Sequence, residues 1–330
     1  MLSTLIQPLE AVIRQDTKRC RRKSWHNAPV RKIVATVGLA LLISGCASSS
    51  TATSTSIQQG SVTAVTIDSN PNFSVSRVIS LANGVAEIMN SLNAHSILVG
   101  RDISSTEAAL DSIPVVTSGH QVIAEKVIAL KPDLVIIDAS TGPKSAIDQI
   151  KSVGIKVVQT PESWTLADIP TKVRAVGVAI GALPQAELLI AAMQSELTSK
   201  KIPRNVKIAF LYLRGTSSIY LIGGPGSGAD SLIKAVGGTD VGAQTLPHPF
   251  NTLTAESLAA MNPDVMLVMS KGLQSVGGID GLLKLPGVAQ TQAGKNKAVI
   301  DVDDSLLLSF GPRTPSLVSA LARAIEGVSK

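Results

Sequence analysis

Few side chains in this chain of 330 residues are suited to chemistry, and they are widely separated. Its four histidines are scattered along the sequence, at His26, His95, His120 and His248. No HExxH or GxSxG motif of a hydrolase occurs, and the glycine-rich stretch Gly223 to Gly228 lacks the Lys-Ser/Thr pair of a P-loop. We therefore expect neither an enzyme nor a catalytic cofactor, and a lone loop histidine such as His120 would by itself be ordinary polar surface.

Both cysteines lie in the first 46 residues, in a segment typical of an export signal. A basic leader precedes the apolar stretch Ile33 to Ile43, which is too short to span a membrane. The stretch runs into Ser44, Gly45 and Cys46, which resembles the bacterial lipobox, where the cysteine is lipidated and becomes the new N-terminus. Residues 1–46 are therefore predicted to be a lipoprotein signal peptide with Cys46 as the lipidated residue. The alternative is a buried apolar helix with a stray cysteine.

Residues 47–75 begin with the Ser/Thr-rich run ASSSTATSTS. Such a composition favours a flexible polar tether between an anchor and a folded domain, and a buried helix would leave it unexplained. The net charge of +6 also belongs to the N-terminus, because the first 46 residues hold eight of the 30 lysines and arginines but two of the 24 acids. The remainder is formally neutral, so a nucleic-acid partner is not expected.

One stretch of the chain occurs twice. Residues Glu125 to Ile137, EKVIALKPDLVII, have a second version from Glu256 to Val268, ESLAAMNPDVMLV. Each copy predicts a short amphipathic helix, a stop at a proline, and then an apolar strand buried on both faces. The two copies are much further apart than the roughly 20 to 50 residues of a solenoid repeat, so they indicate two similar lobes.

Strands alternate with helices on either side of a purely helical segment. This pattern predicts an α/β protein with two lobes, each with a central, mostly parallel sheet. The predicted N-terminal lobe covers 76–165, a helical connector covers 166–200, and the C-terminal lobe covers 201–330. The connector contains the strongest helix pattern, Gln185 to Ser199, which we expect to act as a stiff strut that permits small hinge motion. Strands are expected at 77–81, 97–100, 114–116, 133–137, 155–158, 206–211, 219–222, 264–268 and 298–302, and Asn83 is expected to cap the helix 83–93.

Several of these features together resemble the substrate-binding lipoproteins of ABC importers for iron-siderophores, cobalamin and haem. The features are the lipobox, the stretch RVISLANGVAEIMNSLNA, the repeated E…ALKPDLVI motif, the helical strut and the closing LSFGPRTP. The likeness covers about 75 to 330 and is strongest to the haem-binding branch of Gram-positive bacteria. It implies two Rossmann-like lobes bridged by one long rigid helix, with haem as the transported ligand in the cleft between them.

The resemblance also implies roles for particular residues. Glu125 and Glu256 match the glutamates that dock onto the membrane permease; their other interpretation is two solvated acids favoured by a helix dipole. His120 and Tyr220 match the positions that supply axial ligands to haem iron from the two lobes, since imidazole and phenolate both serve as donors. Tyr220 has the alternative of a strand aromatic packed in the core. In relatives an arginine often lies close to that tyrosine, and here the nearest is Arg214.

Three further segments are candidates for the cleft. His248, in PHPF, lies where a loop lines the cleft in cobalamin-binding relatives and is a reserve ligand or a plain surface turn. Arg313, or the backbone amides from Gly226 to Gly228, would meet a haem propionate. For each of these the structural interpretation is the stronger one.

The expected function is therefore capture of haem outside the cytoplasm and its delivery to an ABC permease and its ATPase. The protein would be a lipid-anchored monomer on the outer face of the cell membrane. Within the same class, a ferric siderophore or cobalamin binder remains an alternative. An adhesion or matrix lipoprotein is disfavoured because two similar lobes imply a cleft.

Overall fold

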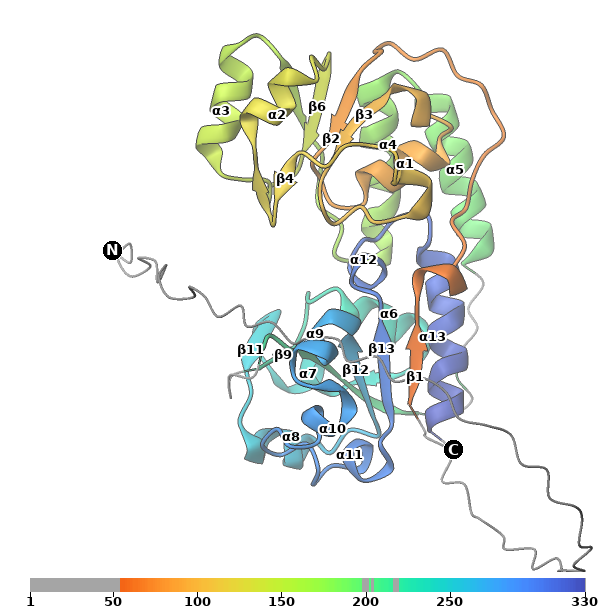
Figure 1. Cartoon of the computed structure of the whole chain (residues 1–330). Coiled ribbons are helices and arrows are strands. Elements are labelled where there is room, and N and C mark those ends of the chain that lie inside the picture. The colour runs from red at the N-terminus through yellow and green to blue at the C-terminus, as the bar shows by residue number, and fades with distance from the viewer. Residues whose placement is uncertain (1–53, 198–201, 203–204, 216–219, 330) are drawn as a thin grey trace, which may run out of the picture. The chain divides into compact units, whose positions relative to one another are not determined.

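Two separate sheets form the centres of two lobes (Figure 1). This computed structural model describes residues 54–197, 202, 205–215 and 220–329, and the predicted signal peptide with Cys46 lies outside them. Among the residues that are described, no helix is long and apolar enough to cross a membrane.

The N-terminal lobe is built on a parallel sheet in the order β3-β2-β6-β7. Successive residues of its inner strands point to opposite faces: Val78 and Leu134 join one core, whereas Ile79 and Val135 join another. The apolar runs of the sequence are thus strands buried on both faces, as predicted. The elements are β2 (Val78–Ser80), α1 (Val85–Ser91), β3 (Leu98–Arg101), α2 (Ala124–Ala129), β6 (Leu134–Ile137), α3 (Lys144–Ser152) and β7 (Lys156–Gln159).

The C-terminal lobe has a larger mixed sheet in the order β1-β13-β12-β8-β9-β11, with β10 beside β8. Its strands are β1 (Thr55–Ile57), β8 (Lys207–Tyr212), β9 (Leu221–Gly223), β10 (Thr239–Asp240), β11 (Phe250–Thr252), β12 (Val265–Met269) and β13 (Val299–Val302). Its helices are α6 (Ala229–Ala235), α7 (Val241–Thr245), α8 (Ala255–Met261), α9 (Ser270–Ser275), α10 (Gly278–Leu282), α11 (Gln292–Asn296), α12 (Asp304–Leu307) and α13 (Thr314–Val328). The two lobes together confirm the predicted α/β class.

The repeated motif has the same structural role in both lobes. The Asp133 carboxylate accepts a hydrogen bond from the backbone N–H of Arg77 at 3.0 Å, and the Asp264 carboxylate accepts one from Lys207 at 2.9 Å. The backbone N–H of each aspartate donates in return to the same partner residue at 2.8 Å. Each aspartate therefore ties the start of its own strand, β6 or β12, to the start of the neighbouring strand, β2 or β8.

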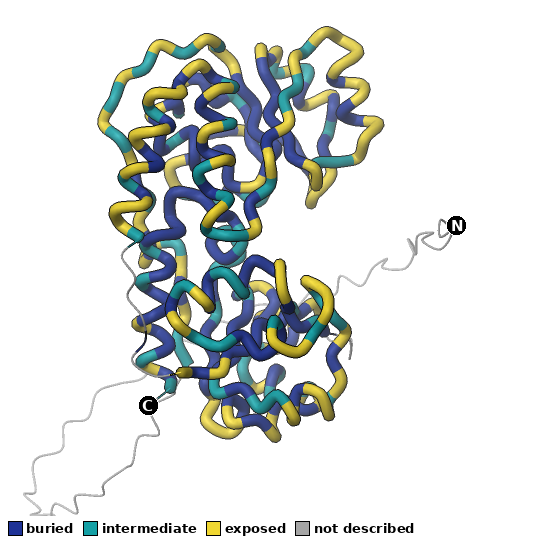
Figure 2. The backbone as a smooth tube through the Cα atoms, turned by 180° about the vertical axis from the view of Figure 1, so that it is seen from behind, coloured by how far each residue is buried: buried dark blue, intermediate teal, exposed yellow. Residues whose placement is uncertain are grey.

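The connector consists of two helices, α4 (Ile169–Ile180) and α5 (Leu183–Glu196), which pack side by side (Figures 1 and 2). Gly181 ends α4 with a left-handed φ of 79°, which glycine adopts without strain. A Cβ on Gly177 would lie 2.4 Å from that of Ala186, so glycine is needed for this close approach. The predicted helix at 185–199 is α5, which also contacts α13 of the C-terminal lobe, but it belongs to a helical hairpin rather than standing alone.

One apolar core continues through both lobes. It contains Val78 of β2, Leu189 of α5, Ile208 of β8 and Leu321 of α13. Because the lobes share this core, separating them would expose apolar surface to water. This continuity supports the predicted small hinge motion.

The tether prediction for 47–75 does not hold over the described part, 54–75. Thr55–Ile57 pairs in parallel with β13, and the side chains of Ile57, Val62 and Val65 are buried. The segment then crosses to the N-terminal lobe, where the backbone N–H of Ile67 donates to the carbonyl oxygen of Ser91, and to the connector, where that of Ser74 donates to the carbonyl oxygen of Ile180. Apolar residues after the Ser/Thr-rich run allow this segment, 54–75, to pack against both lobes, and we call it the strap. The composition of the run alone did not indicate this packing.

Asn83 does not cap α1. Gly84 occupies the N-cap position with φ 72°, and a Cβ there would lie 2.7 Å from the carbonyl oxygen of Ser309. The Asn83 amide instead donates across to the carbonyl of Leu308 at 3.0 Å. Asn83 therefore joins the two lobes next to the cleft.

Candidate functional site

A cavity of about 670 Å³ lies between the lobes, at the carboxyl ends of the strands of both sheets. Leu81 follows β2 and Asp102 follows β3, while Tyr212 ends β8 and Met269 ends β12. Ligands of open α/β sheets bind at this end of the strands, and small-molecule sites commonly have volumes of about 300–1,000 Å³. The cavity is therefore the candidate ligand site.

His120 stands on the N-terminal wall of the cavity. The segment predicted as a loop is a hairpin of two short strands, β4 (Thr117–Ser118) and β5 (Gln121–Val122), with Gly119 and His120 in the turn. Gly119 has φ +55°, which suits glycine in a tight turn. The His120 side chain is exposed and lines the cavity, so its imidazole is available to a ligand.

Tyr212 stands on the C-terminal wall, with Arg214 beside it. The Arg214 guanidinium carbon lies 5.0 Å from the centre of the Tyr212 ring, and its Nε donates to the phenol oxygen at 2.9 Å. Arg214 Nη2 donates to the same oxygen. The ring of Phe250 also meets the Tyr212 ring edge-on, with 5.5 Å between the ring centres. The phenol is thus held in place, with a cation at its oxygen.

The rest of the lining combines an apolar surface with hydroxyl groups. Arg214 and Lys271, both on the C-terminal wall, are the basic residues among the described residues that line the cavity. The apolar lining residues are Leu81, Ile103, Val122, Leu213, Met269 and Leu308, and the hydroxyl-bearing ones besides Tyr212 are Ser104, Thr106, Thr117, Ser140, Thr141, Ser275 and Ser305. Asp102 and Asp304 are the acidic ones among the described lining residues, so the lining offers apolar contact, hydroxyl groups and charges of both signs to a ligand.

Tyr220, the predicted second iron ligand, lies elsewhere. Its side chain is buried in the core of the C-terminal lobe with Ile222 and Leu253, and its hydroxyl donates to the carbonyl oxygen of Pro286. Burial raises the pKa of Tyr220, so this phenol resists conversion to the phenolate that ligates iron. Tyr220 is therefore an aromatic residue packed in the core, which was the alternative interpretation. Tyr212, the other tyrosine of the chain, is the one that faces the cavity.

Two other candidates also lie outside the cavity lining. His248 is exposed in the loop before β11, where its carbonyl oxygen accepts from the Asn251 amide at 2.6 Å. The amides of Gly226 and Gly228 donate to the Asp230 carboxylate at 2.9 and 3.0 Å, so they are already occupied. Neither segment lines the cavity.

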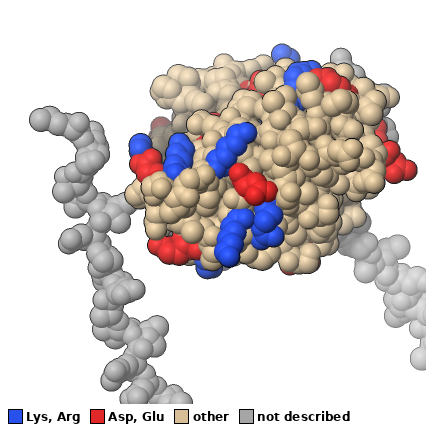
Figure 3. Space-filling model, turned by 90° about the horizontal axis from the view of Figure 1, so that it is seen from above, with Lys and Arg blue, Asp and Glu red and all other residues tan. Residues whose placement is uncertain are grey.

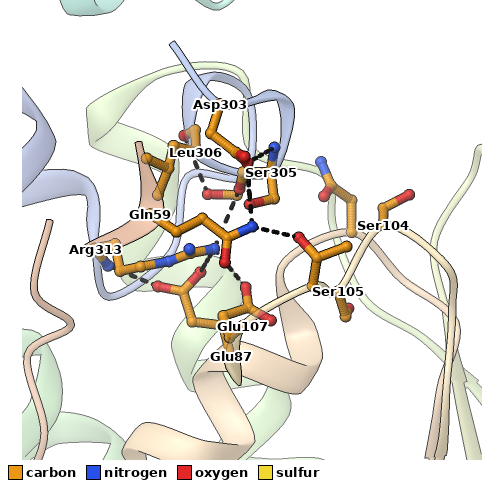
Figure 4. A network of polar contacts seen from close by, with 12 residues as sticks. Gln59, Glu87, Ser104, Ser105, Glu107, Asp303, Ser305, Leu306 and Arg313 are labelled. Carbon is orange, nitrogen blue, oxygen red and sulfur yellow. Dashed lines mark hydrogen bonds and ion pairs between the residues drawn. The ribbon is translucent and has the colours of Figure 1, made fainter. Parts of the chain in front are cut away.

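Arg313 does not reach the ligand either. It is 5% exposed, and its Nη2 lies 3.1 Å from a carboxylate oxygen of Glu87 and also pairs with Glu107 (Figure 4). Glu87 and Glu107 belong to the N-terminal lobe, whereas Arg313 immediately precedes α13. The residue predicted to meet a propionate is therefore part of a buried ionic network between the lobes.

The two predicted docking glutamates occupy equivalent places. Glu125 is in the first turn of α2, and Glu256 is in the first turn of α8. Both side chains are exposed, and Glu125 accepts a long hydrogen bond from Gln149 at 3.4 Å. Each helix immediately precedes the repeated strand of its lobe, so the acids are presented at matching positions on the two lobes.

The described surface carries no broad field of one charge on the face shown in Figure 3. Lysine and arginine side chains there are interspersed with acidic ones, and most of the face is uncharged. Binding to the phosphate backbone of nucleic acid requires a continuous basic surface, so this face gives no support to such a partner.

Two lobes around a cavity at the carboxyl ends of both sheets define a two-lobed binding protein for small molecules. The chain belongs to the periplasmic binding protein family, whose model matches residues 78–306. A curated relative is YvrC of Bacillus subtilis (strain 168), an uncharacterized ABC transporter substrate-binding lipoprotein. It is 27% identical over 301 residues, which cover 87% of this chain and 93% of the relative.

Solved structures with the same architecture include haem-binding proteins. HmuT is 34% identical with a TM-score of 0.73, and the match covers 82% of this chain and 96% of HmuT. RhuT, a periplasmic haem-binding protein from Roseiflexus sp. RS-1, is 33% identical with a TM-score of 0.73 and covers 78% of this chain and 100% of RhuT. HmuT has also been solved with alanine in place of a histidine, of a tyrosine, or of the arginine two positions after that tyrosine.

Proposed function

We propose that this protein captures haem in the cavity between its lobes and delivers it to an ABC transporter permease. The observation that carries the proposal is the pairing of His120 on one wall with Tyr212 on the other, the phenol oxygen being held by Arg214. Imidazole and phenolate are both axial donors to haem iron. With one donor on each wall, a porphyrin between the lobes would be held from both faces.

The cavity also suits the rest of a haem molecule. Apolar side chains from both lobes, among them Leu81, Leu213 and Met269, would cover the porphyrin faces, and their burial would supply most of the affinity. Lys271 on the C-terminal wall offers a positive charge within the same lining. The set His120, Tyr212 and Arg214 parallels the histidine, tyrosine and arginine replaced in the HmuT variants, and the tyrosine-to-arginine spacing is the same.

Delivery of haem would require contact between this protein and the permease. We infer that Glu125 and Glu256 meet basic residues of the permease, since each is exposed at the start of a helix and occupies the same position in its lobe. The relative YvrC is named a lipoprotein of an ABC transporter. A lipid on Cys46 would hold this protein, as a monomer, at the outer face of the membrane, within reach of the permease.

Calorimetric titration of the purified full chain with haemin, cyanocobalamin and a ferric hydroxamate separates the candidates. Haemin is expected to bind stoichiometrically, and the other two should give no saturable heat. Tight binding of the corrinoid or the siderophore, with no haemin binding, would overturn the haem assignment and leave the fold-based class intact.

A further inference from the structure

A buried group of charges joins the two lobes behind the cavity. Arg313 of the C-terminal lobe lies between Glu87 on α1 and Glu107, which precedes the short helix at Ala108–Leu110 (Figure 4). The backbone N–H of Arg313 also donates to the Glu87 carboxylate at 2.6 Å. One guanidinium is thus shared by two carboxylates of the opposite lobe.

The group is ion-paired but incompletely hydrogen-bonded. Glu87 is 2% exposed, and its Oε2 faces Arg313 Nη2 at 3.1 Å without making a hydrogen bond, while Glu107 Oε2 is buried without a hydrogen-bond partner. Arg313 Nε is likewise buried without an acceptor. Burying charges is costly unless pairing and hydrogen bonds compensate, so the buried and incompletely hydrogen-bonded carboxyl group of Glu107 is costly to keep charged.

Other charged groups surround the network. Lys172 of α4 interacts electrostatically with Glu87 and donates to the carbonyl oxygen of Ser309 at 2.9 Å. Asp102, after β3, adds negative charge on the Glu107 side, although it is occupied by the amides of Ser104 and Ser105. The remaining neighbours are Arg101, which donates to the Ser105 carbonyl at 2.6 Å, and Asp303, which caps α12.

The network is continuous with both walls of the cavity. Arg313 Nη2 donates to the carbonyl oxygen of Ser305 at 3.2 Å, and Ser305 lines the C-terminal wall. Glu107 directly follows Thr106, which lines the N-terminal wall. Gln59 of the strap joins the lobes beside these walls, because its amide donates to Thr106 at 2.7 Å and, at 3.4 Å, to Asp303, two positions before Ser305. The network is therefore in a position to influence the distance between the walls.

We propose that Arg313, Glu87 and Glu107 form a proton-sensitive lock that sets the spacing of the cavity walls: a proton on Glu107 holds the lobes together, and its loss loosens them. Arg313 and Glu107 are positioning residues in this lock, since they touch the walls and not the ligand. The part of the proposal that concerns haem affinity rests on the proposed function, whereas the lobe motion does not.

The direction of the pH effect on lobe packing follows from the environments of Glu107 in the packed and loosened forms. Burial, with the neighbouring Glu87 carboxylate, raises the pKa of Glu107 from 4.5 to about 7, although Arg313 opposes the rise. Separation of the lobes would hydrate the carboxyl group and return its pKa toward the ordinary value. The packed form therefore binds the proton more tightly. Packing is favoured fully below about pH 4.5, and the advantage is lost as pH rises through about 7.

Distances between spin labels on the two lobes test the lock without any ligand. The full chain with Cys20→Ser and Cys46→Ser has no native thiol, so Ser152→Cys on α3 and Lys284→Cys after α10 give one exposed label on each lobe. The distance distribution should be narrow at pH 6 and broader and longer at pH 8.5. Glu107→Gln, which mimics the protonated acid, should keep it narrow at both values. An unchanged wild-type distribution, or a Glu107→Gln distribution that broadens with pH as the wild type does, overturns the lock.

The affinity for haemin provides a second test of the lock. The ratio of the wild-type dissociation constant to that of Glu107→Gln should be near one at pH 6 and rise roughly three- to tenfold by pH 8.5. Haemin binding by the wild type weakens because the population of the packed form falls. Taking the ratio removes every effect of pH that the two proteins share, including effects on haemin itself. Glu187→Gln, which breaks the exposed pair with Arg174, is the matched control and should follow the wild type. A flat ratio contradicts the coupling to the cavity, and absence of haemin binding with intact pH-dependent distances contradicts only the proposed ligand.

Discussion

Arg214 lies over the ring of Tyr212, 5.0 Å from its centre, and donates from Nε to the phenol oxygen at 2.9 Å. The contact places a permanent positive charge beside the one tyrosine oxygen that borders the cavity. A phenolate is the form that ligates ferric iron, and a nearby guanidinium stabilises negative charge on that oxygen. The i, i+2 spacing puts both residues at the carboxyl end of β8.

Replacing Arg214 should therefore weaken the iron–tyrosine bond without removing it. Arg214→Lys keeps a charge but loses the planar contact with the ring and the paired donors, so we expect the phenolate-to-iron charge-transfer band to shift and haemin to bind more weakly by about tenfold. Absorption spectra of the haemin complexes measure both effects. Lys271→Gln, which removes the other basic group of the wall, should weaken binding without shifting that band.

His120 is expected to be the donor from the opposite wall. His120→Ala should shift the Soret band and lower affinity while binding persists, because Tyr212 and the apolar surface remain. The matched control is His248→Ala, which removes an exposed histidine outside the cavity lining. If His248→Ala shifts the Soret band and His120→Ala leaves it unchanged, the ligand assignment on this wall is wrong.

Docking should be separable from binding. Glu125→Ala and Glu256→Ala are expected to reduce haem uptake in cells with the cognate permease, and the double variant more than either alone, while haemin affinity in solution stays unchanged. Asp148→Ala, an exposed acid on α3 of the same lobe as Glu125, serves as the control. Parallel loss of affinity and uptake would place the glutamates in the ligand site instead.

The buried network makes a prediction about stability. Arg313→Met leaves two carboxylates in the lobe interface without their cation, so unfolding by urea should show a loss of about 3–5 kcal/mol at pH 8, with a smaller loss at pH 5 where Glu107 can take up a proton. Arg174→Met, in an exposed pair between α4 and α5, should change stability little. Equal effects of the two variants would show that burial of the Arg313 network contributes nothing.

The membrane anchor can be tested by fractionation. Cys46→Ser should release the protein from the membrane fraction, because the predicted lipid is the attachment that remains after the leader is cleaved. A protein that stays with the membranes after this change must be held there by some other segment or partner.

The sequence predicted the α/β class and the duplicated lobes, because the Pro-Asp motif and the apolar runs act locally. Asp133 and Asp264 start buried strands in both copies, and each binds the backbone of the neighbouring strand. His120 was also placed correctly at the cleft, since it directly precedes the helix of the first copy. In these cases neighbours in sequence decide the structure.

Tyr220 was chosen because it matches a position in the family, but it does not line the cavity, whereas Tyr212 does. The predicted strand ended at Leu211, whereas β8 runs to Tyr212, and that residue reaches the rim of the cavity. Tyr220 had the matching residue type but points into the core. The Tyr-x-Arg pair at 212 and 214 was the available signal, because the arginine expected near the tyrosine ligand is next to Tyr212, not Tyr220.

The role of Arg313 and the strap at 54–75 depended on contacts far apart in the chain. Arg313 pairs with acids more than 200 positions earlier, and β1 pairs with β13 near the other end of the chain. No local pattern in GPRTP or in the Ser/Thr-rich run specifies such partners. They follow from how the two lobes pack.

The most direct test is a haemin titration of the purified full chain, followed in the Soret and charge-transfer regions, for the wild type, Tyr212→Phe and Tyr220→Phe. We predict a saturable, stoichiometric Soret band for all three, with the phenolate charge-transfer band present in the wild type and in Tyr220→Phe and absent from Tyr212→Phe. Retention of that band in Tyr212→Phe, or the lack of a saturable Soret band in the wild type, would contradict the assignment of haem to this cavity.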